Sequence, residues 1–184
     1  MLTWFIRRQI DQFEQSYGYD ASYVRHLLEV SPKAVMLFNK ATQLGRFCQG
    51  VPKDVFFVTK IAGVLHEDCG PCVQLGVDMA EQAGVPHTTL RALITGNLNE
   101  LPEDCRLAAQ FAEAVLAHDP KADELRSKLE AKFGALGIVS LACALTAARI
   151  YPTMKYALGF GKACTRVKVG GAPVDRHYAT PNAA

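Results

Sequence analysis

The chain of 184 residues is long enough for one domain with a full hydrophobic core, and its 49% hydrophobic and 21% charged residues are ordinary for a soluble protein. A net charge of +2 with scattered cations excludes the strongly basic surfaces that bind nucleic acid. The first fifteen residues do not resemble a secretory signal, and the longest uncharged run, residues 133–148, is short for a bilayer span, so we expect a cytoplasmic protein without a membrane partner.

Apolar residues recur at helical spacing along almost the whole chain. In the first half, this spacing predicts helices at residues 3–17, 21–29, 31–44, 52–65, 71–83 and 86–96. In the second half, it predicts helices at residues 101–118, 120–133, 136–150 and 152–164. The β-branched run within the fourth of these segments leaves a strand open as an alternative.

These elements predict an all-α protein of about nine or ten helices, without the alternation of strands and helices that a parallel sheet requires. We expect an N-terminal helical region at residues 1–50, packed on a core at residues 51–169, and an irregular tail rich in glycine and proline at residues 170–184. A solvated helix end is the expected position of a polar and aromatic group that follows the apolar helix: Arg149, Tyr151, Lys155 and Tyr156.

Four of the six cysteines stand alone and are expected to be small buried apolar residues: Cys48, Cys105, Cys143 and Cys164. Only Cys69 and Cys72 form a pattern, in the segment Cys69-Gly70-Pro71-Cys72. Thioredoxins carry the same segment, but their parallel sheet is not predicted here. A reducing compartment disfavours a purely structural disulfide, so the pair indicates redox chemistry or metal binding.

A redox dithiol has the stronger support. Pro71 suits the first turn of a helix, which places Cys69 and Cys72 around the helix start, where free N–H groups stabilise a thiolate. His66 is placed to accept a proton from Cys69, and Glu67 to orient His66. On this interpretation Cys69 attacks and Cys72 resolves. The alternatives are a helix-capping His66 and a Glu67 that only complements the next helix dipole.

A zinc site is the weaker alternative. Structural zinc takes four ligands, and the sequence offers Cys69, Cys72 and His66 but no second cysteine pair at ligand spacing. We therefore expect neither a metal nor another cofactor.

Residues 50–165 resemble the alkylhydroperoxidase D-like, or carboxymuconolactone decarboxylase, family. The resemblance rests on an apolar helix before CGPC, on the run VQLGVDMAEQAGVPHTTLRALITGN after it, and on the apolar helices that follow. It implies an all-α fold that forms a dimer, trimer or hexamer through long apolar helices, for which residues 136–150 are the candidate. It also implies that a thiolate reduces a peroxide, that the second cysteine closes a disulfide, and that an unidentified dithiol donor reopens it.

Two positions depart from the family pattern. The family has a histidine four residues after the second cysteine, where this chain has Gly76, and often a glutamate about twelve residues before the first, where this chain has Phe57. We expect Gly76 to leave a space beside Cys72, and His66 with Glu67 to replace the missing proton relay.

The sequence thus favours a cysteine-dependent peroxidase or thiol–disulfide oxidoreductase. The first alternative is a non-enzymatic oligomeric helical protein in which the pair is a redox sensor or a vestige. The second is an enzyme of the decarboxylase type, which needs no redox cysteines.

Overall fold

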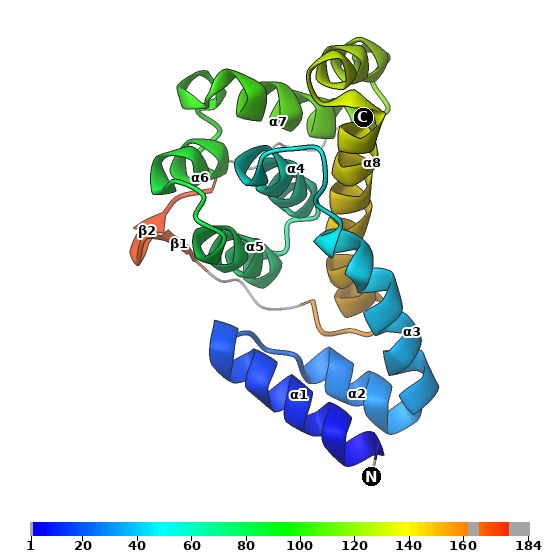
Figure 1. The fold of residues 1–184 in the computed structure, drawn as a ribbon. Helices are drawn as coiled ribbons and strands as arrows, with labels where there is room; N and C mark the ends of the chain where they lie inside the picture. The colour runs from blue at the N-terminus through cyan, green and yellow to red at the C-terminus, as the bar shows by residue number, and fades with distance from the viewer. Residues whose placement is uncertain (1, 162–165, 177–184) are drawn as a thin grey trace.

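The computed structural model describes residues 2–161 and 166–176 (Figure 1). Within these ranges the chain is predominantly helical, with eight α-helices. Those of the first half are α1 (Leu2–Tyr17), α2 (Ser22–Val30), α3 (Pro32–Thr42) and α4 (Lys53–His66). Those of the second half are α5 (Gly70–Gln82), α6 (His87–Ile94), α7 (Glu103–Leu116) and α8 (Lys121–Ala157). Short 3₁₀ helices, η1 (Gln43–Arg46) and η2 (Leu98–Glu100), connect α3 to α4 and α6 to α7.

The all-α prediction is therefore confirmed, and the segment at residues 52–65 is a helix rather than a strand. The first two helices predicted beyond residue 120 are both present within α8, separated by the non-helical Gly134 in the gap predicted between them. One difference is that α8 also includes the start of the third predicted helix. The chain bends at Gly134, whose φ of 69° lies in the left-handed region that glycine tolerates. It then continues through Pro152, a residue expected to end a helix. Pro152 is buried, and the ring of Tyr151 before it packs edge-on against Phe38, so tertiary packing holds this turn in place.

A second difference lies after α8. Strands β1 (Val167–Val169) and β2 (Ala172–Val174) pair in an antiparallel hairpin, where we expected irregular chain from Gly170. Val167, Val169 and Val174 are buried in the main core, and Gly170 and Gly171 take positive φ in the turn. Apolar burial on one face therefore orders a segment whose composition alone indicated a loop. Residues 177–184 of the expected tail lie outside the described ranges.

Two apolar cores position the site. The larger joins α4, α5, α6, α7 and α8, and both paired cysteines belong to it. The smaller joins α1, α2 and α3 to Leu75 of α5 and to partly buried residues of α8, among them Tyr151 and Met154. The N-terminal helices thus pack on the element that carries Cys72, beneath α5 in the view of Figure 1.

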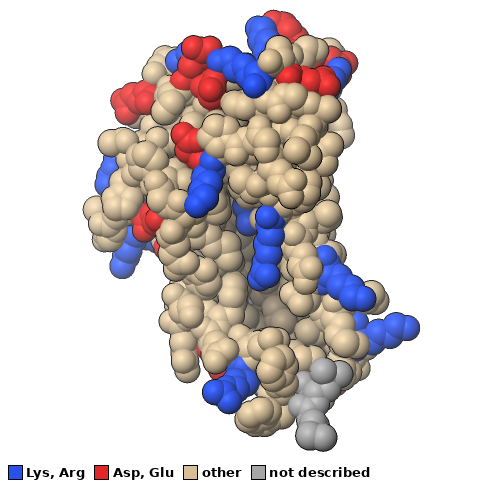
Figure 2. All heavy atoms as spheres, in the orientation of Figure 1, with Lys and Arg blue, Asp and Glu red and all other residues tan. Residues whose placement is uncertain are grey.

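Helix α8 is the one described helix that is long and apolar enough to cross a membrane, with a mean hydropathy of 1.8 in its most apolar window, 39% of which is buried. The core helices of soluble proteins share this property. Charged side chains gather at the end of the molecule formed by α7 and the first part of α8, while much of the rest of this face is uncharged (Figure 2). Leu136 and Val139 of α8 are about half exposed.

Candidate functional site

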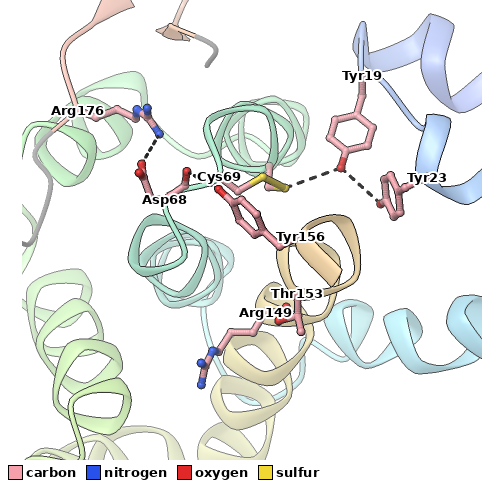
Figure 3. The surroundings of a disulfide bond; sticks show 9 residues. Tyr19, Tyr23, Asp68, Cys69, Arg149, Thr153, Tyr156 and Arg176 are labelled. Carbon is pink, nitrogen blue, oxygen red and sulfur yellow. Dashed lines mark hydrogen bonds and ion pairs between the residues drawn. A yellow bond between two sulfur atoms is a disulfide. The ribbon is translucent and has the colours of Figure 1, made fainter. Parts of the chain in front are cut away.

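The two cysteines lie at the start of α5. Helix α4 ends at His66, the chain turns through Asp68 in the left-handed region (φ 50°), and Cys69 is the residue that precedes α5. Pro71 takes the first turn, and the N–H of Val73 donates to the Cys69 carbonyl at 2.9 Å. This geometry brings the Cα atoms of Cys69 and Cys72 to 5.2 Å, and a disulfide joins the two side chains (Figure 3).

The disulfide is buried, and a tyrosine from the N-terminal region reaches it. Cys69 and Cys72 are 5% and 4% exposed. The hydroxyl of Tyr19, in the turn between α1 and α2, lies 3.8 Å from the Cys72 sulfur. The same hydroxyl donates to the hydroxyl of Tyr23 at 3.4 Å (Figure 3). Cys72 therefore has a hydroxyl group as a neighbour, contributed by a segment more than fifty residues earlier in the chain.

A buried amine lies behind these two phenols. Lys155 of α8 is 2% exposed, and its Nζ is 5.0 Å from the ring centre of Tyr19 and 5.7 Å from that of Tyr23. Burial lowers the pKa of Lys155, and the nearby Asp20 carboxylate opposes that shift. Burial also raises the pKa of Tyr19 to about 12 and raises the pKa of Tyr23. Both phenols are therefore neutral, and able to donate, at physiological pH.

The opposite side of the disulfide carries acids that are paired with arginines. Glu67 Oε1 accepts from Arg149 Nε at 2.5 Å, and Asp68 Oδ1 lies 3.5 Å from Arg176 Nη1. The hydroxyl of Tyr156 donates to the Asp68 carbonyl at 3.3 Å, which fixes the turn before Cys69 (Figure 3). The two carboxylates that would otherwise disfavour a thiolate are thus compensated by cations.

The structure does not assemble the relay predicted from His66 and Glu67. His66 is exposed in the last turn of α4, and within the described ranges no hydrogen bond or ion pair joins it to either sulfur or to Glu67. Glu67 turns instead to Arg149. Whether either residue takes part in chemistry stays a prediction.

A side chain at Gly76 would press on α4. Gly76 is buried, and a Cβ built on it would lie 3.2 Å from Cγ1 of Ile61, which is closer than most Cβ contacts, so Ile61 would have to shift. The expected space beside Cys72 stays a prediction. Phe57 stands at the position where the family pattern often has a glutamate. Its ring packs edge-on against Phe56, and the ring centre lies 5.7 Å from Nζ of Lys60.

Among the residues that the structure describes, the remaining cysteines form no second site. Cys105 is buried, and burial together with Asp54 raises the pKa of its thiol to about 12, which makes it unreactive. Cys48 and Cys143 are partly buried, and Cys164 lies outside the described ranges. Among the residues that the structure describes, no three His, Cys, Asp or Glu side chains lie close enough together to hold a metal ion.

Comparisons with protein families, with characterised proteins and with solved structures find no significant match for this chain. The site is therefore interpreted from its own geometry. Sequence reasoning found the cysteine pair but missed Tyr19, and it expected Lys155 to be solvated. No local signal marks either residue, because only the packing of α1 to α3 on α5 and α8 brings them to Cys72.

Proposed function

We propose that the protein is a thiol–disulfide redox protein in which Cys69 and Cys72 cycle between a dithiol and a disulfide. The observation that carries the proposal is the disulfide at the start of α5 with the Tyr19 hydroxyl 3.8 Å from one of its sulfurs. A helix start favours a thiolate, and an adjacent hydroxyl supplies a hydrogen bond to it. A disulfide that served only to staple the fold would need neither.

The proposed reaction is the reduction of a peroxide. A thiolate of the pair attacks one peroxide oxygen, the O–O bond breaks, and the leaving oxygen takes a proton to become water or an alcohol. The other thiol then attacks the resulting sulfenic acid, which releases water and forms the disulfide. A dithiol donor, not identified here, reopens the disulfide by exchange and becomes a disulfide itself.

The burial of both sulfurs favours a small substrate. With only 5% and 4% of Cys69 and Cys72 exposed, a hydrogen peroxide molecule or a small hydroperoxide fits the site better than a disulfide displayed by another protein. The same argument favours a small dithiol as the electron donor.

The alkylhydroperoxidase D-like family is the proposed relative. The helical order around Cys69 and Cys72 supports this relationship, whereas Gly76 and Phe57 depart from the family pattern. We propose that the Tyr19 hydroxyl near Cys72, with the Lys155 amine over the Tyr19 ring, takes the functional place of the missing relay, which favours a redox enzyme over a vestige. A redox sensor that uses the same disulfide without turnover is the second candidate, favoured by the burial of both sulfurs.

We also propose that α8 pairs with a second copy of the chain, which would place this apolar helix in a soluble, cytoplasmic oligomer. Residues of one face follow the alternating three- and four-residue spacing of a helix–helix seam. Three of them are exposed, Leu136, Val139 and Thr146, and two are partly buried, Cys143 and Ile150. We expect Leu136→Glu to convert a dimer or larger oligomer to monomers in size-exclusion chromatography with light scattering. A wild-type monomer would contradict the seam without affecting the redox proposal.

Turnover tests the redox proposal. The purified protein is supplied with hydrogen peroxide and dithiothreitol, and peroxide consumption is compared with that of Cys69→Ser, Cys72→Ser and the matched control Cys143→Ser. We expect consumption by the wild type and by Cys143→Ser alone. Equal rates in all four proteins would overturn the proposal, and a disulfide that forms and reopens without turnover would select the sensor.

A further inference from the structure

The environment of the two sulfurs is unequal, and this inequality assigns them different roles. Cys72 faces the Tyr19 hydroxyl, whereas the described contacts of the turn before Cys69 are made by backbone and by ion pairs at the surface. We infer that Tyr19, supported by Lys155, stabilises the thiolate of Cys72 when the disulfide opens. The inference rests on the proposed redox function and names the residues that would carry it.

The hydrogen bonds of the two tyrosines can reverse without moving the rings. In the disulfide form, the Tyr19 hydroxyl donates to Tyr23 and lies 3.8 Å from a neutral sulfur, which is a weak acceptor. Once Cys72 carries a negative charge, it becomes a strong acceptor, and charge-assisted hydrogen bonds are roughly twice as strong as neutral ones. Tyr19 then donates to the sulfur, and Tyr23 donates to Tyr19. Each hydroxyl keeps a partner in both states.

Lys155 supplies the positive charge. Its Nζ lies 5.0 Å from the ring centre of Tyr19, the phenol whose hydroxyl approaches the sulfur, and 5.7 Å from that of Tyr23. The other ionisable groups coupled to this cluster are Tyr151 of α8 and Asp20, the latter next to Tyr19 in the chain. A thiolate at Cys72 would stabilise the protonated form of this buried amine in return. Lys155 is thus a positioning residue, and Tyr19 is the catalytic one.

The consequence is a direction for disulfide reduction. The donor thiolate attacks Cys69 Sγ, a sulfur–sulfur bond forms between donor and Cys69, and the electron pair of the broken bond leaves on Cys72 Sγ. The second thiolate of the donor then attacks its own first sulfur, which closes the donor disulfide and releases Cys69 as a thiolate that takes a proton. The better-stabilised leaving group is Cys72, because Tyr19 donates to it. In the dithiol, Cys72 is then the ionised sulfur, the reverse of the order that the sequence suggested.

The test is the pH dependence of alkylation in the reduced protein, with iodoacetamide as the probe and each cysteine resolved by peptide mass spectrometry. We expect half-maximal labelling of Cys72 at a lower pH than that of Cys69. Tyr19→Phe and Lys155→Met should each move the Cys72 midpoint up by about one pH unit, a tenfold loss of thiolate at a fixed lower pH, and leave the Cys69 midpoint in place. The matched controls are Tyr17→Phe and Lys60→Met. The Tyr17 hydroxyl donates to Gln82, and the partly buried Lys60 amine donates to the Gly45 carbonyl.

An unchanged Cys72 midpoint in folded Tyr19→Phe would overturn the inference. A wild-type protein in which Cys69 ionises at a lower pH than Cys72 would overturn it as well. If Lys155→Met fails to fold by circular dichroism, Tyr19→Phe decides alone. Peroxide turnover together with unchanged Cys72 midpoints in the variants would contradict the role of Tyr19 and leave the proposed function standing. Shifted Cys72 midpoints without peroxide turnover would contradict the enzymatic function and leave the role of Tyr19 standing.

Discussion

The disulfide separates two regions of different chemistry. On the side of α1 and α2, the neutral phenol of Tyr19 faces Cys72, and Tyr23 and the buried amine of Lys155 contact that phenol. On the side of the turn between α4 and α5, two carboxylates lie near Cys69 in the chain, each paired with an arginine. The first region is buried and lies within reach of a sulfur, whereas the second is nearer to solvent and holds the backbone of the turn.

This contrast teaches that proximity in sequence is a poor guide to which groups act on the sulfurs. His66, Glu67 and Asp68 directly precede Cys69, yet the structure directs Glu67 and Asp68 toward arginines and leaves His66 exposed. Tyr19, far away in sequence, places its hydroxyl 3.8 Å from the Cys72 sulfur. The N-terminal region therefore contributes a side chain to the site.

The largest expected effect comes from removing either sulfur. Cys69→Ser and Cys72→Ser should each lower peroxide turnover by about a hundredfold or more, because the disulfide between Cys69 and Cys72 can no longer form. The oxidised form of the remaining cysteine in each variant shows which sulfur is the reactive one. Cys69→Ser should accumulate a sulfenic acid or mixed disulfide at Cys72, detected by dimedone labelling or intact mass, whereas accumulation only in Cys72→Ser would place the reactive thiolate on the turn side.

A smaller effect is expected from the phenol. At a pH below the Cys72 midpoint, Tyr19→Phe should lower turnover by about tenfold, because losing a donor to the thiolate shifts ionisation to higher pH by about one unit. The loss should shrink as the pH rises through the shifted midpoint. A rate profile parallel to that of the wild type at every pH would show that Tyr19 only packs.

Introducing a histidine at position 76, as in the alkylhydroperoxidase D-like pattern that the sequence resembles, should not raise activity. Gly76→His forces a side chain against Ile61 and is expected to destabilise the protein by about 1–3 kcal/mol, a cost typical of overpacking. For a chain of this size, each kcal/mol corresponds to about 2–4 °C in melting temperature. Differential scanning calorimetry checks the shift. A variant as stable as the wild type and more active would show that the site beside Cys72 is open after all.

The smallest effect is expected on the turn side. Arg149 is 48% exposed, and exposed ion pairs contribute about 0–1 kcal/mol, so Arg149→Met should change turnover by less than about threefold. The remaining effect should fade as salt is added, because ions screen the freed Glu67 carboxylate. A loss as large as that of Tyr19→Phe, measured side by side at low and high salt, would reverse the comparison between the two regions.

Much of the fold follows from local rules. Helical spacing, Pro32 and Pro71 in first turns, and Gly84 after a helix predict most helix boundaries to within a few residues, and the cysteine pair locates the centre of the site. The failures have a common physical origin in tertiary packing. Helix α8 continues through Pro152 because that turn is buried, and the β1–β2 hairpin forms because its valines fill the main core.

The same reason explains what was missed at the site. An aromatic residue near the N-terminus and a lysine at the end of an apolar helix carry no pattern that indicates a neighbouring disulfide. The lysine contacts the Tyr19 ring, and the Tyr19 hydroxyl reaches Cys72, only because the second apolar core joins helices that are far apart in the chain. Local sequence patterns cannot predict such a long-range contact, whereas the segment Cys69-Gly70-Pro71-Cys72 is enough to predict a helix start with two cysteines.

The central claim, that Cys69 and Cys72 form a reversible redox pair, is tested most directly by equilibrating the native protein with mixtures of reduced and oxidised dithiothreitol. Intact and peptide mass spectrometry then follow the loss and return of two hydrogen atoms at this pair. The account predicts a single reversible two-electron transition confined to Cys69 and Cys72, with full recovery of the dithiol. A pair that never closes, or that closes and cannot be reopened in the folded protein, would contradict it.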